Sequence, residues 1–184
     1  KGDSFKLSEI LNGRDLQMLL YLYSCIKNGE ELLKATVPAG VLYFPAKRQA
    51  TDSKSEYIKM SGLLLDEEST LRQMEQSLDG KIIPAHIRPN GSSFYSTESM
   101  VSENAFKIIF KYLEVLLSRI GSSIMRGEIT PEPLKVGDKS QCKYCDYRAV
   151  CRISPQAPEK QGLDCKNSEA LNIIEEEMEK LNGN

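Results

Sequence analysis

The sequence predicts an α/β fold that is mostly helical within this chain. A mostly apolar helical pattern over residues 14–26 leads into a segment at 36–46 that is rich in β-branched and aromatic residues. Two further amphipathic helical patterns follow, at 103–126 and 168–181. A helix that runs into a buried strand is typical of α/β proteins, and a single strand requires sheet partners elsewhere in the chain.

The first half of the chain divides at short turn signals. Residues 2–12 are predicted to form a loop that ends at Asn12-Gly13, and the helix over 14–26 is expected to stop at Asn28-Gly29. The strand at 36–46 is nearly continuously apolar, which predicts that it is covered on both faces. Residues 47–61 are polar and are expected to form a loop.

The second half has a short helix at 67–78, an irregular stretch at 79–99 and the clearest helix of the chain at 103–126. Gly127 ends this helix, and its apolar residues fall at helical spacing: Phe106, Ile109, Phe110, Leu113, Leu116, Leu117 and Ile120. A Pro-rich linker at 154–162 precedes the last helix, whose stripe is Leu171, Ile174, Met178 and Leu181. We therefore expect one unit at 1–153 that includes a cysteine cluster at 142–151, followed by a linker and helix at 154–184.

Composition restricts the possible functions. The 184 residues carry 24 Lys plus Arg against 26 Asp plus Glu, a net charge of −2, which argues against a general nucleic-acid-binding surface but permits a local basic groove. No apolar run approaches the roughly 20 residues of a membrane-spanning helix. The chain starts without an initiator Met or a signal peptide. We expect a processed, engineered or truncated chain that is cytoplasmic and has no membrane partner.

The cysteine cluster is the most informative segment. Cys142, Cys145 and Cys151 place three thiols in ten residues with the spacing C-x2-C-x5-C. A C-x2-C pair on a turn lets two sulfurs converge, and thiolates favour zinc or iron–sulfur clusters over hard cations. The alternative, three reduced cysteines packed as small apolar residues, is disfavoured because charged residues interleave them.

Spacing alone leaves the metal open between zinc and iron–sulfur. Zinc sites usually need a second cysteine or histidine pair, and the only histidine, His86, is expected to be a surface or hydrogen-bonded loop residue. Cys165 is a possible fourth ligand. Cys25 is also possible, but its apolar helix predicts that it belongs to the core.

A narrow polar strip is predicted on the helix at 14–26. Gln17 and Tyr21 are four residues apart and so lie on one face, which Ser24 joins. The opposite side carries the apolar residues Leu16, Leu19, Leu20, Tyr23 and Ile26. The strip is either a functional face or a simple solvated one.

These residues together resemble a known family. The run from Gly13 to Leu22 resembles the G-x-x-x-Q-x-x-x-Y motif of RecB-family nucleases, which belong to the PD-(D/E)XK class. Residues 38–44 resemble the strand that follows this helix in the AddB family of helicase/nuclease proteins. Residues 142–151 resemble the three C-terminal cysteines of that family's iron–sulfur staple, and motif order agrees over roughly residues 1–155.

The resemblance implies the C-terminal portion of a restriction-endonuclease-like PD-(D/E)XK nuclease fold. It implies a [4Fe–4S] cluster on Cys142, Cys145 and Cys151, with a fourth cysteine far upstream and outside this chain. It also implies a Mg²⁺ site formed by an Asp and a D-x-K pair on preceding strands, which are likewise outside the chain. The family's catalytic Lys would fall just before Lys1, so only Gln17 and Tyr21 are carried over as catalytic positions.

The function implied is part of an ATP-dependent DNA exonuclease that acts in double-strand-break repair and homologous recombination. Its partners would be DNA and an AddA-like helicase/nuclease subunit, and the chain alone is expected to be inactive. Two alternatives remain open: a non-catalytic zinc- or DNA-binding cysteine module, and a smaller CRISPR-associated iron–sulfur exonuclease. The long segment at 47–102 favours the AddB-like interpretation over the latter.

Overall fold

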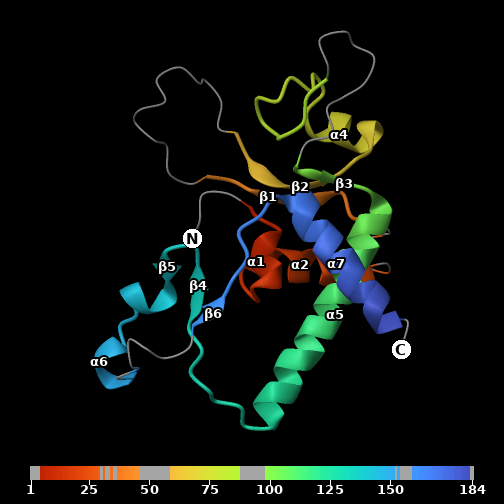
Figure 1. Cartoon of the computed structure of the whole chain (residues 1–184). Helices are drawn as coiled ribbons and strands as arrows, with labels where there is room; N and C mark the ends of the chain where they lie inside the picture. Colours follow the sequence, from red (N-terminus) through yellow and green to blue (C-terminus); the bar gives the residue numbers. More distant parts are fainter. Residues whose placement is uncertain are drawn as a thin grey trace, which may run out of the picture.

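A computed structural model describes residues 5–29, 31, 34, 37–45, 59–87, 98–151, 153 and 159–182. Its helices are α1 (Ser8–Leu11), α2 (Gln17–Asn28), α4 (Glu68–Met74), α5 (Glu103–Met125), α6 (Arg148–Cys151), α7 (Asn167–Asn182) and the 3₁₀ helix η1 (Gln141–Tyr144). Its strands are β1 (Gly40–Tyr43), β2 (Ser61–Leu65), β3 (Met100–Val101), β4 (Leu134–Val136), β5 (Lys139–Ser140) and β6 (Lys160–Gln161). The expected α/β class, rich in helix, is confirmed (Figure 1).

The main sheet has the order β1-β2-β3, with β1 and β2 antiparallel and β2 and β3 parallel. Its central strand, β2, was not predicted. Alternate residues of β2 enter two cores: Leu63 and Leu65 join the larger one, and Leu64 joins a smaller one beside α4. The sheet is thus covered on both faces at β2, as the period-two geometry of a strand allows.

β1 is shorter and less buried than the apolar run at 36–46 predicts. Only Val41 is buried within β1, while Val37 before it and Phe44 after it are 44% and 61% exposed. Gly62 of β2 explains the close pairing here, because a Cβ at that position would lie 1.9 Å from the Val41 carbonyl oxygen.

The larger core is formed mainly by helices. α5 begins at the N-cap Ser102, whose hydroxyl accepts a hydrogen bond from the Ala105 N–H at 3.1 Å, and the chain turns at Gly127 with φ +68°. Its first half buries Phe106, Ile109 and Leu113. α7 packs against both α1 and α5 (Figure 1), and contributes Ala170, Ile174 and Met178 to the same core.

Several local expectations are corrected. The predicted loop at 2–12 contains α1, and Leu7 and Ile10 on either side of its start are 0% and 1% exposed. Four residues are too short for a helical period to show in the sequence. The helix predicted at 67–78 ends at Met74. Leu181, which was predicted to lie on the apolar stripe of the last helix, is 43% exposed.

The stretch after α4 is irregular, as predicted for the described residues 79–87. The buried carboxylate of Glu75 organises it, accepting hydrogen bonds from the backbone N–H groups of Lys81, Ile82 and Ile83 at 3.1 to 3.3 Å. The expectations for residues 46–58, 88–97 and 154–158 fall outside the described residues.

Candidate functional site

The polar face of α2 is present as predicted. The Gln17 Nε2 amide donates a hydrogen bond of 2.7 Å to the Tyr21 hydroxyl, and both side chains are exposed. Tyr21 is 57% exposed, whereas Leu19 on the opposite side is fully buried. The four-residue spacing therefore brings the amide and the phenol into direct contact on the surface.

The strip continues along the helix toward its C-terminal end. Ser24 is exposed, and the Asn28 side chain donates to its carbonyl oxygen at 3.3 Å. Cys25 is exposed too, so the prediction that it belongs to the core is wrong. The reason is helical geometry: at about 100° per residue, a residue four positions after Tyr21 lies only about 40° from it.

Polar contacts between side chains hold α2 to α5. Glu114 of α5 accepts hydrogen bonds from the Tyr23 hydroxyl and from Lys27 Nζ, the latter at 2.8 Å. The Lys27 ammonium, followed by the Tyr23 hydroxyl, lowers the pKa of the Glu114 carboxyl. This contact and the apolar side of α2 position the helix, so the Gln17–Tyr21 face has a defined orientation.

The cysteine segment is a short, locally bonded structure. Cys142 lies in η1, Cys145 caps its end, and Cys151 closes α6. The Cys145 N–H donates to the Cys142 carbonyl at 3.4 Å, and the Cys151 N–H donates to the Tyr147 carbonyl at 2.8 Å. All three thiols are free, and those of Cys145 and Cys151 are on exposed residues.

The chemistry of this donor set fits a thiolate-bound metal, because three free cysteines, two of them exposed, lie on one short segment. Within the described part of the chain, no three His, Cys, Asp or Glu side chains lie close enough to hold a metal ion. The fit thus depends on donor type and sequence spacing. The described residues also hold no such group of carboxylates for Mg²⁺, whose ligands the family resemblance implies to lie outside this chain.

A small sheet closes the base of the cysteine segment. β4 pairs with β5 on one side and, in parallel, with β6 on the other. The N–H of Gly162 donates to the Lys135 carbonyl at 2.7 Å, and an ion pair of 3.3 Å joins Lys135 to Glu159. Residues 159–162, expected as linker, are therefore bonded to the strand that precedes the cysteines.

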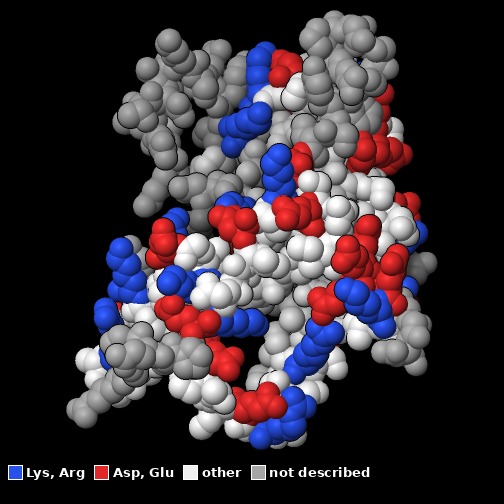
Figure 2. Space-filling view, viewed as in Figure 1, with Lys and Arg blue, Asp and Glu red and all other residues white. Residues whose placement is uncertain are grey.

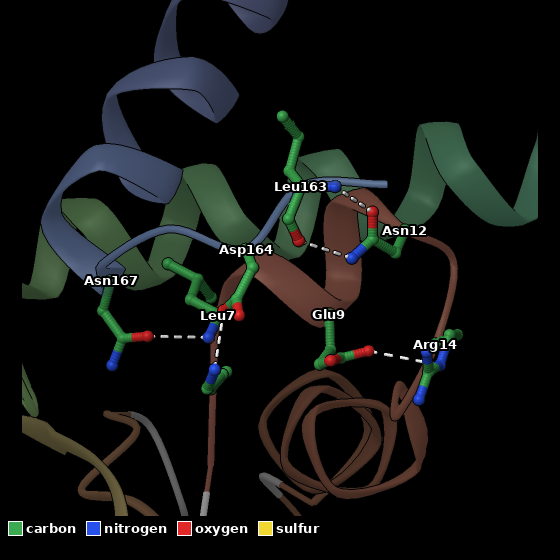
Figure 3. Close-up of polar contacts among 8 residues, drawn as sticks. Leu7, Glu9, Asn12, Arg14, Leu163, Asp164 and Asn167 are labelled. Carbon is green, nitrogen blue, oxygen red and sulfur yellow. Dashed lines mark hydrogen bonds and ion pairs between the residues drawn. The ribbon is translucent and has the colours of Figure 1, made fainter. Parts of the chain in front are cut away.

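The chain after β6 is fixed to α1 by a group of polar contacts that we name the tail clamp (Figure 3). The Asn12 amide both accepts from the Leu163 N–H and donates to the Leu163 carbonyl, each at 2.8 Å. The Leu7 N–H donates to the Asn167 side-chain oxygen at 2.7 Å, and Lys6 pairs with Asp164 at 2.6 Å. Sequence reasoning missed this clamp because its partners lie more than 150 residues apart.

Cys165 and His86 both take part in local packing or backbone pairing. Cys165 packs against the larger core, and burial, together with the Glu169 and Asp164 carboxylates, raises the pKa of its thiol. In the chain, Cys165 follows directly after the Asp164 of the tail clamp. His86 is half-buried and forms a β-bridge with Asp79, which agrees with the expected loop position.

Surface charge is mixed on the face shown in Figure 2, where basic and acidic residues are interspersed. This view gives no sign of an extended basic surface, in line with the balanced composition. Of the helices in the described ranges, none combines the length and the apolar character needed to cross a membrane.

Comparison with known proteins identifies the family. A profile of the PD-(D/E)XK nuclease superfamily matches residues 4–152. Proteins named as the B subunit of an ATP-dependent helicase/deoxyribonuclease are 34% identical over 193 residues in Bacillus cereus, 30% over 199 in Natranaerobius thermophilus and 30% over 165 in Desulforamulus reducens. The matches cover 94%, 98% and 82% of this chain but only 16%, 17% and 14% of those proteins, about a sixth of their length. The chain belongs to the PD-(D/E)XK nuclease superfamily.

Proposed function

We propose that this chain is the C-terminal part of the nuclease domain of an AddB-type helicase/deoxyribonuclease protein. The complete protein would digest DNA in an ATP-dependent complex with an AddA-like subunit, during double-strand-break repair and homologous recombination. The names of the relatives support this proposal. The observation that carries it is the hydrogen-bonded, exposed Gln17–Tyr21 pair on a helix held firmly by the core.

In the proposed mechanism, Gln17 and Tyr21 position the DNA strand. In a PD-(D/E)XK nuclease a bound Mg²⁺ would supply the activation of water and the neutralisation of developing charge, and its ligands would come from strands outside this chain. Because the Tyr21 oxygen accepts the Gln17 amide N–H, the Tyr21 O–H is directed away from Gln17. That O–H would donate to a phosphate oxygen of the DNA strand, and Gln17 would keep the phenol in place.

We further propose that Cys142, Cys145 and Cys151 supply three ligands of a [4Fe–4S] cluster, with the fourth from a cysteine outside this chain. The free thiols on one segment support this. The cluster would be a structural cross-link and would take no part in hydrolysis. It would join the cysteine segment to an upstream part of the polypeptide.

The nuclease proposal is tested on the complete subunit assembled with its partner. Gln17→Ala and Tyr21→Phe should each lower Mg²⁺-dependent cleavage of single-stranded DNA by about ten- to a hundredfold, because they displace or remove a positioning group. ATP hydrolysis should be unchanged. Ser24→Ala, one turn further along the same strip, is the matched control and should cleave normally.

The isolated chain provides the second arm of this test. We expect it to cleave no DNA at any Mg²⁺ concentration. Cleavage by the pure chain that Gln17→Ala abolishes would overturn the assignment of the metal ligands to other segments. Full activity of both variants in the complete subunit would remove the role of the pair.

A further inference from the structure

The apolar stripe of α5 is buried only along the first half of the helix. Phe106, Ile109 and Leu113 are fully buried against the core. On the same face, the second half carries Leu117 at 41%, Ile120 at 38% and Ile124 at 71% exposed, and Met125 beside them is 87% exposed. Figure 1 shows this half of α5 extending beyond α7.

The exposed residues form one continuous surface, which we name the α5 stripe: Leu117, Ile120, Gly121, Ile124 and Met125. Their spacing of i, i+3, i+4, i+7 and i+8 is the pattern of a helix face that packs against another element. The remaining positions of these turns are polar: Ser118, Arg119, Ser122, Ser123 and Arg126. The second half of α5 is thus amphipathic as well.

Gly121 gives a second, independent indication of a partner. A Cβ built at this glycine meets no atom within 4 Å beyond its immediate neighbours and its own helix backbone. Glycine is less favourable than alanine inside a helix, and no contact of the described residues requires it here. A glycine in an apolar stripe lets another backbone approach closely, which suits a second helix.

The charges that border the α5 stripe are already paired within the chain. Arg119 binds Glu177 of α7 at 2.6 Å, and Arg126 binds Glu128 at 2.7 Å. An incoming partner therefore needs no charged residues to match this rim. Its contact face is expected to be apolar and uncharged.

We propose that the α5 stripe is the docking face for an apolar helix of the same polypeptide, from the part outside residues 1–184. The relatives extend to about six times the length matched by this chain, so a complete protein of that length would have ample polypeptide to supply it. The stripe also continues directly from the nuclease core, which favours a partner in the same folded chain. This inference rests on the proposed function in that the chain is taken as part of a longer polypeptide, but it does not depend on the catalytic role of Gln17 and Tyr21.

The test uses the complete subunit, assembled with its partner, with the photo-crosslinker p-benzoylphenylalanine placed at Ile124. Mass spectrometry should identify cross-linked peptides from the same polypeptide outside residues 1–184. Mixing with isotope-labelled, probe-free subunit separates links within one chain from links to a second copy. The matched control carries the probe at Ser122, on the polar side of the same turns, and should give about tenfold less product.

Gly121→Ala sharpens the test because the added methyl group limits how closely another backbone can approach α5. In the complete subunit it should reduce cross-linking from position 124 several-fold, whereas the isolated chain should be at least as stable as the parent. Cross-links to the partner subunit or to a second copy, or a yield at Ile124 no higher than at Ser122, would overturn the proposal.

Discussion

At the scale of single residues, the return of the chain to α1 depends on two small features. The Asn12 amide imitates a strand neighbour by bonding both the N–H and the carbonyl of Leu163. Gly162 lies against it, and a Cβ at this position would come within 2.7 Å of Val136 Cγ2 and 2.8 Å of Asn12 Oδ1. The sequence alone indicates neither, because an Asn and a Gly in loops have many other roles.

Gly162→Ala should therefore destabilise the chain by about 1–3 kcal/mol, since the added methyl overlaps Val136 and displaces the Asn12 amide. The measurement is the urea midpoint of the purified chain. Gly121→Ala is the matched control and should stabilise by up to about 1 kcal/mol, because it removes a helix-interior glycine in open space. Equal effects of the two substitutions would contradict the close packing at Gly162.

At the scale of elements, α7 is docked through its N-terminal end. Glu98 accepts hydrogen bonds from the Ser168 N–H and hydroxyl, both at 2.9 Å, and its carbonyl accepts the Asn167 amide at 2.7 Å. The two bonds from Ser168, the backbone one first, lower the pKa of the Glu98 carboxyl below its ordinary value of 4.5. A carboxylate at a helix N-terminus also complements the helix dipole.

Docking of α7 should weaken in acid because of Glu98. Because the pKa of Glu98 is lowered in the folded state, the stabilisation by its carboxylate is fully present above the ordinary pKa of 4.5. This stabilisation is lost as the pH falls through the folded-state pKa. The protection factors of the α7 amides, which are corrected for the pH dependence of intrinsic exchange, should fall between about pH 5 and pH 3, and Glu98→Gln should flatten this dependence. The pKa of the Glu67 carboxyl is also lowered, by the Thr70 and Ser69 hydroxyls of α4. Glu67→Gln is therefore the control and should leave the pH dependence of α7 unchanged.

The elements also show how far sequence reasoning extends. α2, α5 and α7 were predicted to within a few residues because each is long enough for its apolar period to be clear. α1, β2 and β6 were missed, since each is at most five residues long and depends on distant partners. The Gln17–Tyr21 contact could be predicted because it is local, whereas the tail clamp joins opposite ends of the chain.

At the scale of the whole molecule, the chain belongs to the PD-(D/E)XK nuclease superfamily, and the matched residues 4–152 include the cysteine segment. The tail clamp and the β4–β6 pairing fix the polypeptide on both sides of that segment through hydrogen bonds between protein groups. The two ends of the cysteine segment and the thiols within it would therefore be held in different ways. Protein contacts fix the ends of the cysteine segment, and any cluster would fix the thiols between them.

Iron loading of the complete subunit, purified without oxygen, tests the ligand assignment. Cys145→Ser should lower bound iron and the broad visible absorbance at least about threefold, because a thiolate ligand is lost. Cys25→Ser is the matched control, an exposed cysteine on α2, and should keep both. A colourless protein with stoichiometric zinc would instead support the alternative zinc module.

The parallel pairing of β4 with β6 also constrains how this region can change in length. A tight turn cannot join parallel strands, which need a connection of roughly a dozen residues or more. The residues between Val136 and Lys160, which include all three clustered cysteines, serve as that crossover. A shortened relative that lost the thiols would still have to keep enough polypeptide here, or give up the strand that leads into α7.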